Sequence, residues 1–310
     1  MSGLDVISIL IVNWNTGDLL CRCLASIPAG LGDLPAEVIV VDNASTDDSL
    51  ARVSERPWLR VVRRGDNVGF AAGTDQAARL ASGRQLLLLN PDTECAPGAV
   101  ARLSAFLDAN PDVAAVGPRL RHSDGRVQRS CWRGYPGLRS AFIDALYLWK
   151  VPDLPLVRGS EVDAGRAAGP IDVDHLLGAC MLIPRAAWEA IGPLDEGYFL
   201  FLEETDWCRR ARGAGYRVCH LPAAEVLHHG EHSVHQVPVR STVNYYRGLV
   251  RFARRGRLGA GQLAALKVVL ALGAVVRLGL WTGRLMGSRR GLALGMLSGY
   301  ARVLRELPGY

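Results

Sequence analysis

Residues 85–93 read QLLLLNPDT, and this stretch decides the fold. Its first five residues form an apolar run without alternation, which is typical of a strand covered on both faces. The polar residues Asn90 and Asp92 follow directly. Open α/β sheets bind ligands beyond the carboxyl ends of their strands. A carboxylate at that position can hold a hard divalent cation, with substrate phosphates as further ligands.

Short apolar runs alternate with helical patterns both before and after this stretch. We predict further strands at 6–12, 37–41, 59–62, 113–116, 172–183, 217–221 and 225–227, and helices at 18–27, 45–53, 70–81, 97–108, 185–191 and 203–213. Residues 120–170 are irregular apart from a short helix near 138–149. Alternating strands and helices predict an α/β fold with a mostly parallel, doubly wound central sheet.

Two other strand ends carry short polar side chains. Asn13-Trp14-Asn15 follows the first predicted strand, and Asp42 follows the second. Together with Asp92 they predict a nucleoside diphosphate bound across the strand ends. The chain has neither GxGxxG after its first strand nor GxxxxGK[ST], which argues against a dinucleotide-binding dehydrogenase and a P-loop NTPase.

Charge divides the chain near residue 236. Residues 1–235 hold 23 basic and 29 acidic side chains, whereas residues 236–310 hold 13 basic side chains and one acid, Glu306. We therefore expect two domains, 1–235 and 236–310, the second a basic helical extension. Residues 1–5 lack the basic start of a signal peptide, and none of the seven cysteines forms a CxxC pair, so we expect a cytosolic body with reduced thiols.

The basic extension contains a long apolar stretch, 263–285, interrupted by Lys267, Arg277 and Arg284. These charges fall on one side of a helix, a pattern typical of a helix that lies on an anionic membrane surface. The alternative is a helical subdomain packed on the body or at a dimer interface, and the sequence leaves the oligomeric state open. A nucleic-acid partner is disfavoured because no aromatic platform is interleaved with the arginines.

Five motifs, in this order, resemble those of the family 2 glycosyltransferases, which have the GT-A fold. They are VNWN at 12–15, VDNASTD at 41–47, NVGF at 67–70, LNPD at 89–92 and EETDWC at 203–208, followed by His228. The resemblance covers residues 6–235 and is greatest to bacterial rhamnosyltransferases of cell-wall and polysaccharide assembly. Asp75 stands where members of the family often have Asn.

The resemblance implies roles for the strand ends. The nucleotide-binding residues would be Asn13, Asn15, Asp42, Asn67, Gly69, Asn90 and Asp92. Asp42 would contact the base, and Asp92 with His228 would hold Mg²⁺ or Mn²⁺. A zinc site in the histidine-rich run HHGEHSVH, 228–235, is the alternative, but the run lacks the HExxH order.

The acidic cluster supplies the catalytic candidates. The resemblance places the base at Glu204 and leaves Glu203 and Asp206 open, while acids at a helix start also match the helix dipole. The implied enzyme is a metal-dependent, inverting hexosyltransferase. It moves a sugar from a nucleotide diphosphate sugar, dTDP-rhamnose, to a hydroxyl of a glycan or polyprenyl-linked acceptor. We expect it in the cytoplasm, peripheral at the inner face of the cell membrane. A UDP-sugar donor, or a silent nucleotide- or glycan-binding protein of the same fold, is the alternative.

Overall fold

The computed structural model describes residues 6–128, 130–132, 134–151, 154–156, 167–230, 237–285 and 290–310. Its internal contacts divide the chain into two units. The sheet unit comprises Met1–Arg133, Glu161–Phe199 and Glu203–His232, and the helical unit comprises Gly134–Ser160, Leu200–Leu202 and Ser233–Tyr310. The boundary expected between 235 and 236 lies outside the described residues.

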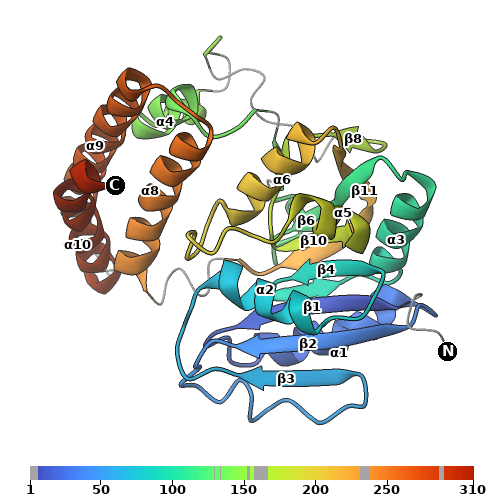
Figure 1. Ribbon diagram of the computed structural model, residues 1–310. Helices are drawn as coiled ribbons and strands as arrows, with labels where there is room; N and C mark the ends of the chain where they lie inside the picture. The colour runs from blue at the N-terminus through green and yellow to red at the C-terminus, as the bar shows by residue number, and fades with distance from the viewer. Residues whose placement is uncertain are drawn as a thin grey trace. The chain divides into compact units, whose positions relative to one another are not determined.

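A mixed, mostly parallel sheet forms the centre of the sheet unit (Figure 1). Its strands run in the order β3-β2-β1-β4-β10-β6-β11-β5, with β8 beside β11. Their bounds are β1 Ile7–Asn13, β2 Ala36–Asp42, β3 Leu59–Arg63, β4 Gln85–Leu89, β5 Thr93–Cys95, β6 Val113–Arg121, β8 Ile171–Asp172, β10 Cys180–Pro184 and β11 Arg217–His228. β10, β5 and β8 pair antiparallel with their neighbours, while β1, β2, β3 and β4 are parallel.

Helices cover both faces of this sheet, as the unalternating strands predict. Their bounds are α1 Leu19–Leu31, α2 Phe70–Leu80, α3 Ala99–Ala109, α5 Arg185–Ile191 and α6 Glu203–Gly213. One apolar cluster joins the strands to α1 and α3, and a second joins them to α2, α5 and α6. All seven cysteines are free thiols. The doubly wound α/β architecture expected from the sequence is confirmed.

Two predicted elements are wrong. The helix expected at 45–53 is a series of turns, because Ser45 and Ser49 use their hydroxyls in side-chain hydrogen bonds described below rather than as helix caps. The strand expected at 172–183 is split into β8, β9 (His175–Leu176) and β10. β9 leaves the main sheet and pairs with β7, Cys131–Trp132. Apolar content alone does not reveal such a change of partner.

The helical unit contains α4 Leu138–Ala145, α8 Pro238–Arg255, α9 Ala260–Thr282 and α10 Arg290–Glu306, with short 3₁₀ turns η1 Leu148–Lys150 and η2 Leu307–Gly309. Glycines allow these helices to approach closely. A Cβ on Gly295 would lie 2.6 Å from the Pro238 side chain, and one on Gly273 would lie 3.0 Å from Ala145. Gly273, which lowers helix propensity in isolation, therefore marks the crossing of α4 and α9.

Asp75 connects α2 to the loop that leads into α6. Its side chain is buried, and Oδ1 accepts a hydrogen bond from the Leu194 amide at 3.0 Å. Burial, together with the charge of nearby Glu196, raises the pKa of Asp75 to about 7. A raised carboxyl pKa means that the folded state holds a proton that the unfolded chain releases near pH 4. Stability from this group is present at low pH and is lost as the pH rises from about 4 to about 7.

We expect Asp75→Asn to stabilise the protein at pH 8 by about 1–3 kcal/mol and to change little at pH 4. The amide keeps an oxygen for the Leu194 N–H and carries no charge to bury. Urea unfolding across this pH range measures the difference. Asp33→Asn, on an exposed carboxylate, is the control. A stability difference that does not vary with pH would refute this account.

Candidate active site

Three parallel strands bring their polar ends to one edge of the sheet. β1 lies between β2 and β4, and Asn13 pairs in register with Asp42. β4 ends at Leu89, so Asn90 and Asp92 follow at the same edge. The predicted gathering of these residues at the carboxyl ends of the strands is confirmed.

Asp42 is held in a network of hydrogen bonds. Its Oδ1 accepts from Asn13 Nδ2 at 2.7 Å and from Ser45 Oγ at 2.6 Å, while Oδ2 accepts from the Ser45 amide at 3.1 Å. Asn13 also donates to Ser49 Oγ and accepts from Thr16 Oγ1. Because Asn13 has no exposed surface, it acts by orienting Asp42.

Asn15 organises the turn that follows β2. It adopts a left-handed backbone, φ 51°, and its Oδ1 accepts from the amides of Thr46 at 2.7 Å and Asp47 at 3.3 Å. Asp47 in turn accepts from the amide of Gly17. The predicted site residue Asn15 therefore shapes the loop beside Asp42 through backbone contacts. Ser45 and Ser49 were missed as site residues because their spacing also fits a helix start.

Only glycine fits at position 69, because of both its backbone conformation and its close neighbours. Its φ is 90°, and a Cβ there would lie 2.2 Å from the Phe199 carbonyl oxygen. The Gly69 amide donates to Asn67 Oδ1, and its carbonyl accepts from Asn43 Nδ2 at 2.9 Å. Asn67 also lines an open pocket of about 440 Å³ together with Arg64. Asn43, which carried no predicted role, is the link between β2 and the start of α2.

Asp92 and His228 lie side by side. His228 Nε2 is 3.4 Å from Asp92 Oδ1, and both side chains are nearly buried. Burial opposes ionisation of Asp92, but the hydrogen bond and charge of His228 outweigh it and hold the pKa of this carboxyl below its usual value. His228 Nδ1 donates to Gln128 Oε1 at 2.8 Å, which directs Nε2 toward Asp92. Gln128 lies in the irregular segment, where no sequence signal marked it.

The neighbouring histidine points elsewhere, as expected for adjacent residues in a strand. His229 bridges Glu94 Oε1 at 2.8 Å and Ser123 Oγ at 3.0 Å. His232 and His235 lie outside the described residues. Within the described residues no three His, Cys, Asp or Glu side chains gather as a metal cluster. Asp92 and His228 are the two candidate ligands that the described residues place together.

The separation of Asp92 and His228 fits two ligands of one divalent cation, whose remaining ligands would come from elsewhere. Two adjacent ligand atoms of a six-coordinate Mg²⁺ lie about 3 Å apart, close to the separation of Asp92 Oδ1 and His228 Nε2. Asn90, two residues before Asp92, is uncharged, so Asp92 is the one acid of this strand end. Two protein ligands leave most positions for waters and substrate phosphates, the usual arrangement for Mg²⁺ at phosphates.

The acidic pair begins α6 and is buried. Glu203 Oε2 has no hydrogen-bond partner among the described residues, and Glu204 Oε1 accepts from Thr205 Oγ1 at 3.1 Å. Burial raises the pKa of both carboxyls, and the charge of Glu204 raises that of Glu203 further. A Cβ on Gly178 would lie 3.3 Å from Glu204 Cγ, so this glycine makes room for the acid.

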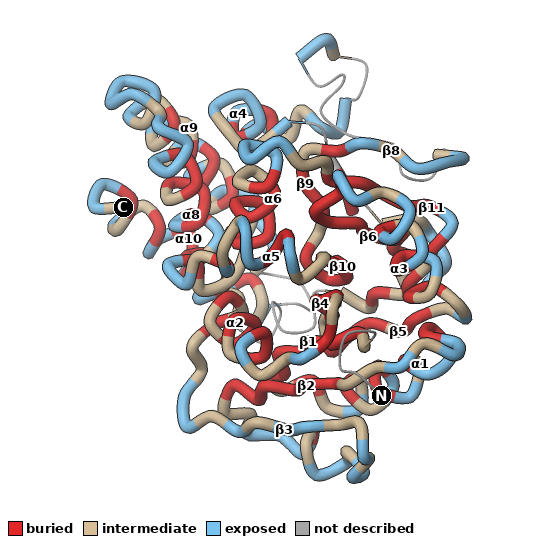
Figure 2. Tube along the Cα trace, turned by 45° about the vertical axis from the view of Figure 1, so that its right-hand side comes forward, coloured by how far each residue is buried: buried red, intermediate tan, exposed pale blue. Residues whose placement is uncertain are grey.

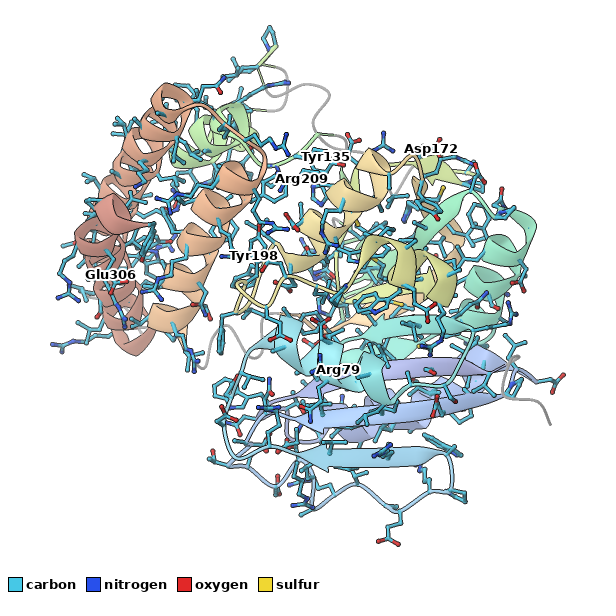
Figure 3. All side chains as sticks on the ribbon, in the orientation of Figure 1. Arg79, Tyr135, Asp172, Tyr198, Arg209 and Glu306 are labelled. Atoms are coloured by element: carbon cyan, nitrogen blue, oxygen red, sulfur yellow. The ribbon has the colours of Figure 1, made fainter. Side chains whose placement is uncertain are left out.

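Asp206 has a different environment. It is fully buried and pairs with Arg209 at 2.7 Å and Arg210 at 3.1 Å. The hydroxyl of Tyr198 lies 3.5 Å from its Oδ1, and Figure 3 labels Tyr198 and Arg209. Trp207 of the same helix is also buried and stacks on Trp188 in the core. Of the three catalytic candidates, Asp206 is the one whose charge is already neutralised.

One hydrogen bond joins the acidic pair to the strand end that carries Asp92. The Asn90 amide donates to the Ala179 carbonyl at 2.9 Å, and Ala179 follows Gly178, which packs on Glu204. Asp42 and Asp92 thus follow parallel strands at the same edge, and this hydrogen bond connects the segment that carries Asp92 to the strand beside Glu204. Such an edge can bind a nucleoside diphosphate and place a carboxylate near its far end.

Comparison with known families agrees with this geometry. Residues 8–151 match the family described as Glycosyl transferase family 2. The matched segment is just under half of the chain, and over it the protein is similar to the family 2 glycosyltransferases. This segment contains Asn13, Asp42 and Asp92, whereas Glu204 and His228 lie beyond it.

Curated relatives extend the likeness over most of the chain. The chain is 29% identical over 266 residues to the N-acetylglucosaminyl-diphospho-decaprenol L-rhamnosyltransferase of Mycobacterium tuberculosis, and the match covers 80% of this chain and 84% of that one. It is 25% identical to a low-salt glycan biosynthesis hexosyltransferase of Haloferax volcanii, covering 73% and 67%. The resemblance to rhamnosyltransferases is confirmed.

Solved structures confirm the GT-A fold of this chain. A mannosyltransferase of Pyrobaculum calidifontis, in complex with GDP-Man and Mn²⁺, aligns with TM-score 0.55 and 19% identity over 97% of this chain and 84% of that one. GalNAc-T7 with UDP, GalNAc and Mn²⁺ aligns with TM-score 0.59 and 17% identity over 82% of this chain. This chain spans about half, 48%, of the GalNAc-T7 chain.

We expect Gln128→Ala to weaken Mn²⁺ binding about tenfold or more, because the His228 ring loses the acceptor that orients it. Gln128→Glu keeps an acceptor for Nδ1–H and should retain most of the affinity. Electron paramagnetic resonance of free Mn²⁺, in the presence of a nucleoside diphosphate, measures both variants. Equal Mn²⁺ affinity in Gln128→Ala and the unaltered protein would show that this contact does not position His228.

Proposed function

We propose that the glycosyltransferase is an inverting, metal-dependent hexosyltransferase acting on a nucleotide diphosphate sugar. The observation that carries this proposal is the link between Asp92 and Glu204 through the Asn90–Ala179 hydrogen bond. A leaving diphosphate needs its negative charge neutralised, whereas an attacking hydroxyl needs a base to accept its proton. The link would place Asp92, which would hold the cation, and Glu204, which would be the base, within one site. A single displacement from the face opposite the diphosphate inverts the anomeric centre and needs no covalent sugar–enzyme intermediate.

Asp42 would recognise the base of the donor, with Asn13 and Ser45 fixing the direction of its carboxylate. Three hydrogen bonds to Asp42 leave one lone pair on Oδ2, which can accept an N–H of a pyrimidine ring. We propose dTDP-rhamnose as the donor, supported by the likeness to an L-rhamnosyltransferase. A UDP-sugar presents the same N–H and is the second candidate. Asn15, Asn67, Gly69 and Asn90 would form the rest of the nucleotide pocket.

Asp92 and His228 would hold Mg²⁺ or Mn²⁺ against the diphosphate. When bound, such a cation neutralises the negative charge that develops on the leaving group. The protein's own part is to keep Asp92 ionised and the His228 ring oriented, which the contacts of Gln128 and His228 achieve. Two solved GT-A relatives contain Mn²⁺, which supports a divalent cation in this fold.

Glu204 would accept the proton from the attacking hydroxyl. A general base works best when its pKa lies near the working pH, and burial moves the pKa of Glu204 upward from its usual value. Burial also raises the pKa of Glu203, and the charge of Glu204 raises it further, so each carboxyl opposes the ionisation of the other. The ion pairs of Asp206 with Arg209 and Arg210 disfavour it as the base.

The acceptor would be a hydroxyl of a glycan or polyprenyl-linked sugar in cell-envelope polysaccharide synthesis, by analogy with the decaprenol-linked substrate in the relative's name. A lipid-linked acceptor lies at a membrane, so we place the enzyme in the cytoplasm as a peripheral protein at the inner face. In this proposal residues 1–235 form the catalytic domain, and residues 236–310 form a basic helical region for that contact.

We expect one nucleoside diphosphate among UDP, dTDP, GDP and ADP to raise the melting temperature, and to do so more with Mn²⁺ or Mg²⁺ present. Asp92→Asn should remove the metal-dependent part of that shift and leave the smaller metal-free part. Thermal denaturation with each diphosphate measures both. If none of the four shifts the melting temperature, the donor proposal is wrong and a silent protein of this fold is favoured.

We expect Glu204→Gln to lower the rate of sugar transfer by about 10²–10⁴-fold while donor binding stays nearly unchanged. Gln has a similar shape but accepts no proton at neutral pH. Transfer is measured with radiolabelled donor, and binding by the diphosphate-induced melting shift. Glu189→Gln, on an exposed residue of α5, is the control. A fully active Glu204→Gln enzyme would rule out this base, and loss confined to Glu203→Gln would assign the role to Glu203.

A further inference from the structure

Exposed apolar side chains concentrate in the helical unit. Thirteen large hydrophobic residues are exposed in the described part of the chain, and twelve of them belong to this unit. The exception is Val61, on β3 of the sheet unit. Such a concentration is unusual for a surface that faces only water, and marks an interaction site.

Helix α9 presents an apolar face away from its own unit. Val268, Leu272 and Val275 are 68%, 43% and 53% exposed. At 100° per residue they fall within about 60° of one another. The buried residues Leu266 and Leu270 lie on the opposite side of the helix. Figure 2 shows exposed and buried positions alternating along α9.

The charges of α9 face inward, which reverses the usual order of an amphipathic helix. Arg277 is 8% exposed, pairs with Asp144 at 2.7 Å and lies 4.9 Å from the centre of the Tyr147 ring. Lys267 Nζ donates to the Pro308 carbonyl at 2.8 Å. Two of the three charges read from the sequence, Lys267 and Arg277, therefore hold the helical unit together, and the apolar stripe remains outside.

Helix α4 and the turn after it add to this apolar surface. Leu138, Phe142 and Leu146 recur every four residues and are 42%, 38% and 38% exposed, followed by Trp149 at 38%. α4 packs on α9 where Gly273 meets Ala145. This segment precedes the basic region in sequence, so no charge or composition signal associated it with α9.

Aromatic rings paired with cations border the apolar surface. Lys150 lies 5.1 Å from the Tyr147 ring centre and 5.6 Å from that of Trp149, and Arg284 lies 4.6 Å from the ring of Trp281. Amphipathic aromatic and long basic side chains of this kind are enriched at the boundary between lipid tails and headgroups. The excess of basic residues after residue 236 matches the charge of anionic headgroups.

We propose that the helical unit docks on an anionic lipid bilayer through the outward faces of α9 and of the segment 138–149. The apolar side chains would enter the headgroup region, and the bordering cations would contact lipid phosphates. This inference rests on the proposed membrane location of the enzyme and names the surface that would make the contact. It also identifies α4 and η1, which precede the basic region in sequence, as part of that surface.

The proposed docking keeps α9 in the plane of the membrane. Among the described residues α9 alone has the length and apolar composition to cross a membrane. Crossing would separate Arg277 from Asp144 and Lys267 from η2, and would place both charges in hydrocarbon at a cost of about 3 kcal/mol or more each. Lying on the surface keeps both contacts and still buries Val268, Leu272 and Val275.

Flotation of the full chain with vesicles tests this surface. Vesicles of phosphatidylcholine with phosphatidylglycerol should carry the protein upward, and pure phosphatidylcholine should carry much less. The double variant Val268→Ser/Val275→Ser should reduce binding to the anionic vesicles about tenfold or more, because two exposed valines lose apolar burial in lipid. Val61→Ser makes the same change on the sheet unit and should float like the unaltered protein.

Several outcomes would overturn the inference. Flotation of the double variant equal to that of the unaltered chain, or no flotation of the unaltered chain, would exclude this surface. Resistance to alkaline carbonate extraction would show a spanning helix instead. A lipid-free dimer that Val268→Ser/Val275→Ser dissociates would assign the face to a second copy. The diphosphate-induced melting shift, measured without lipid in each variant, separates a failure of docking from a failure of the proposed transferase function.

Discussion

The parallel pairing of β1 with β2 and β4 is the constraint on which the site depends. Parallel strands end at a common edge, so one register determines which side chains meet there. Asn13 lies opposite Asp42 in that register, and the 2.7 Å hydrogen bond between them sets the direction of the Asp42 carboxylate. A shift of one residue would turn Asp42 to the other face of the sheet and disconnect it from Ser45. The direction of the Asp42 carboxylate therefore follows from backbone pairing before any ligand is present.

The other end of the site consists of buried charge that is only partly compensated. Asp92 is stabilised by His228, whereas Glu203 and Glu204 sit together with raised pKa values and few donors. Buried acids that lack donors lower stability, and such groups are concentrated at functional sites. By contrast, Asp206, three residues into the same helix, is neutralised by two arginines and serves the fold. Environment, more than residue type, separates the catalytic candidates from the structural acid.

The helical unit follows a different physical rule. Its helices cross at Gly273 and Gly295, and its charges pair with one another, as Glu306 of α10, labelled in Figure 3, does with the partly exposed Arg247 and Arg302. Its outward surface keeps the apolar side chains that a water-soluble subdomain would bury. This is the surface that the proposed docking on a lipid bilayer would use.

The sequence by itself determined the α/β class, most strand and helix positions, and the motif set that indicates a glycosyltransferase, because apolar runs and short polar strand ends are local signals. Tertiary structure decided what local patterns leave open. Ser45 and Ser49 hydrogen-bond across the strand ends instead of starting a helix, and β9 leaves the central sheet to pair with β7. Gln128 reaches His228 from an irregular segment a hundred residues away in sequence. Periodicity also left open whether the charged face of α9 is buried or exposed. A helical repeat defines two faces, and only the packed neighbours determine which face is inside.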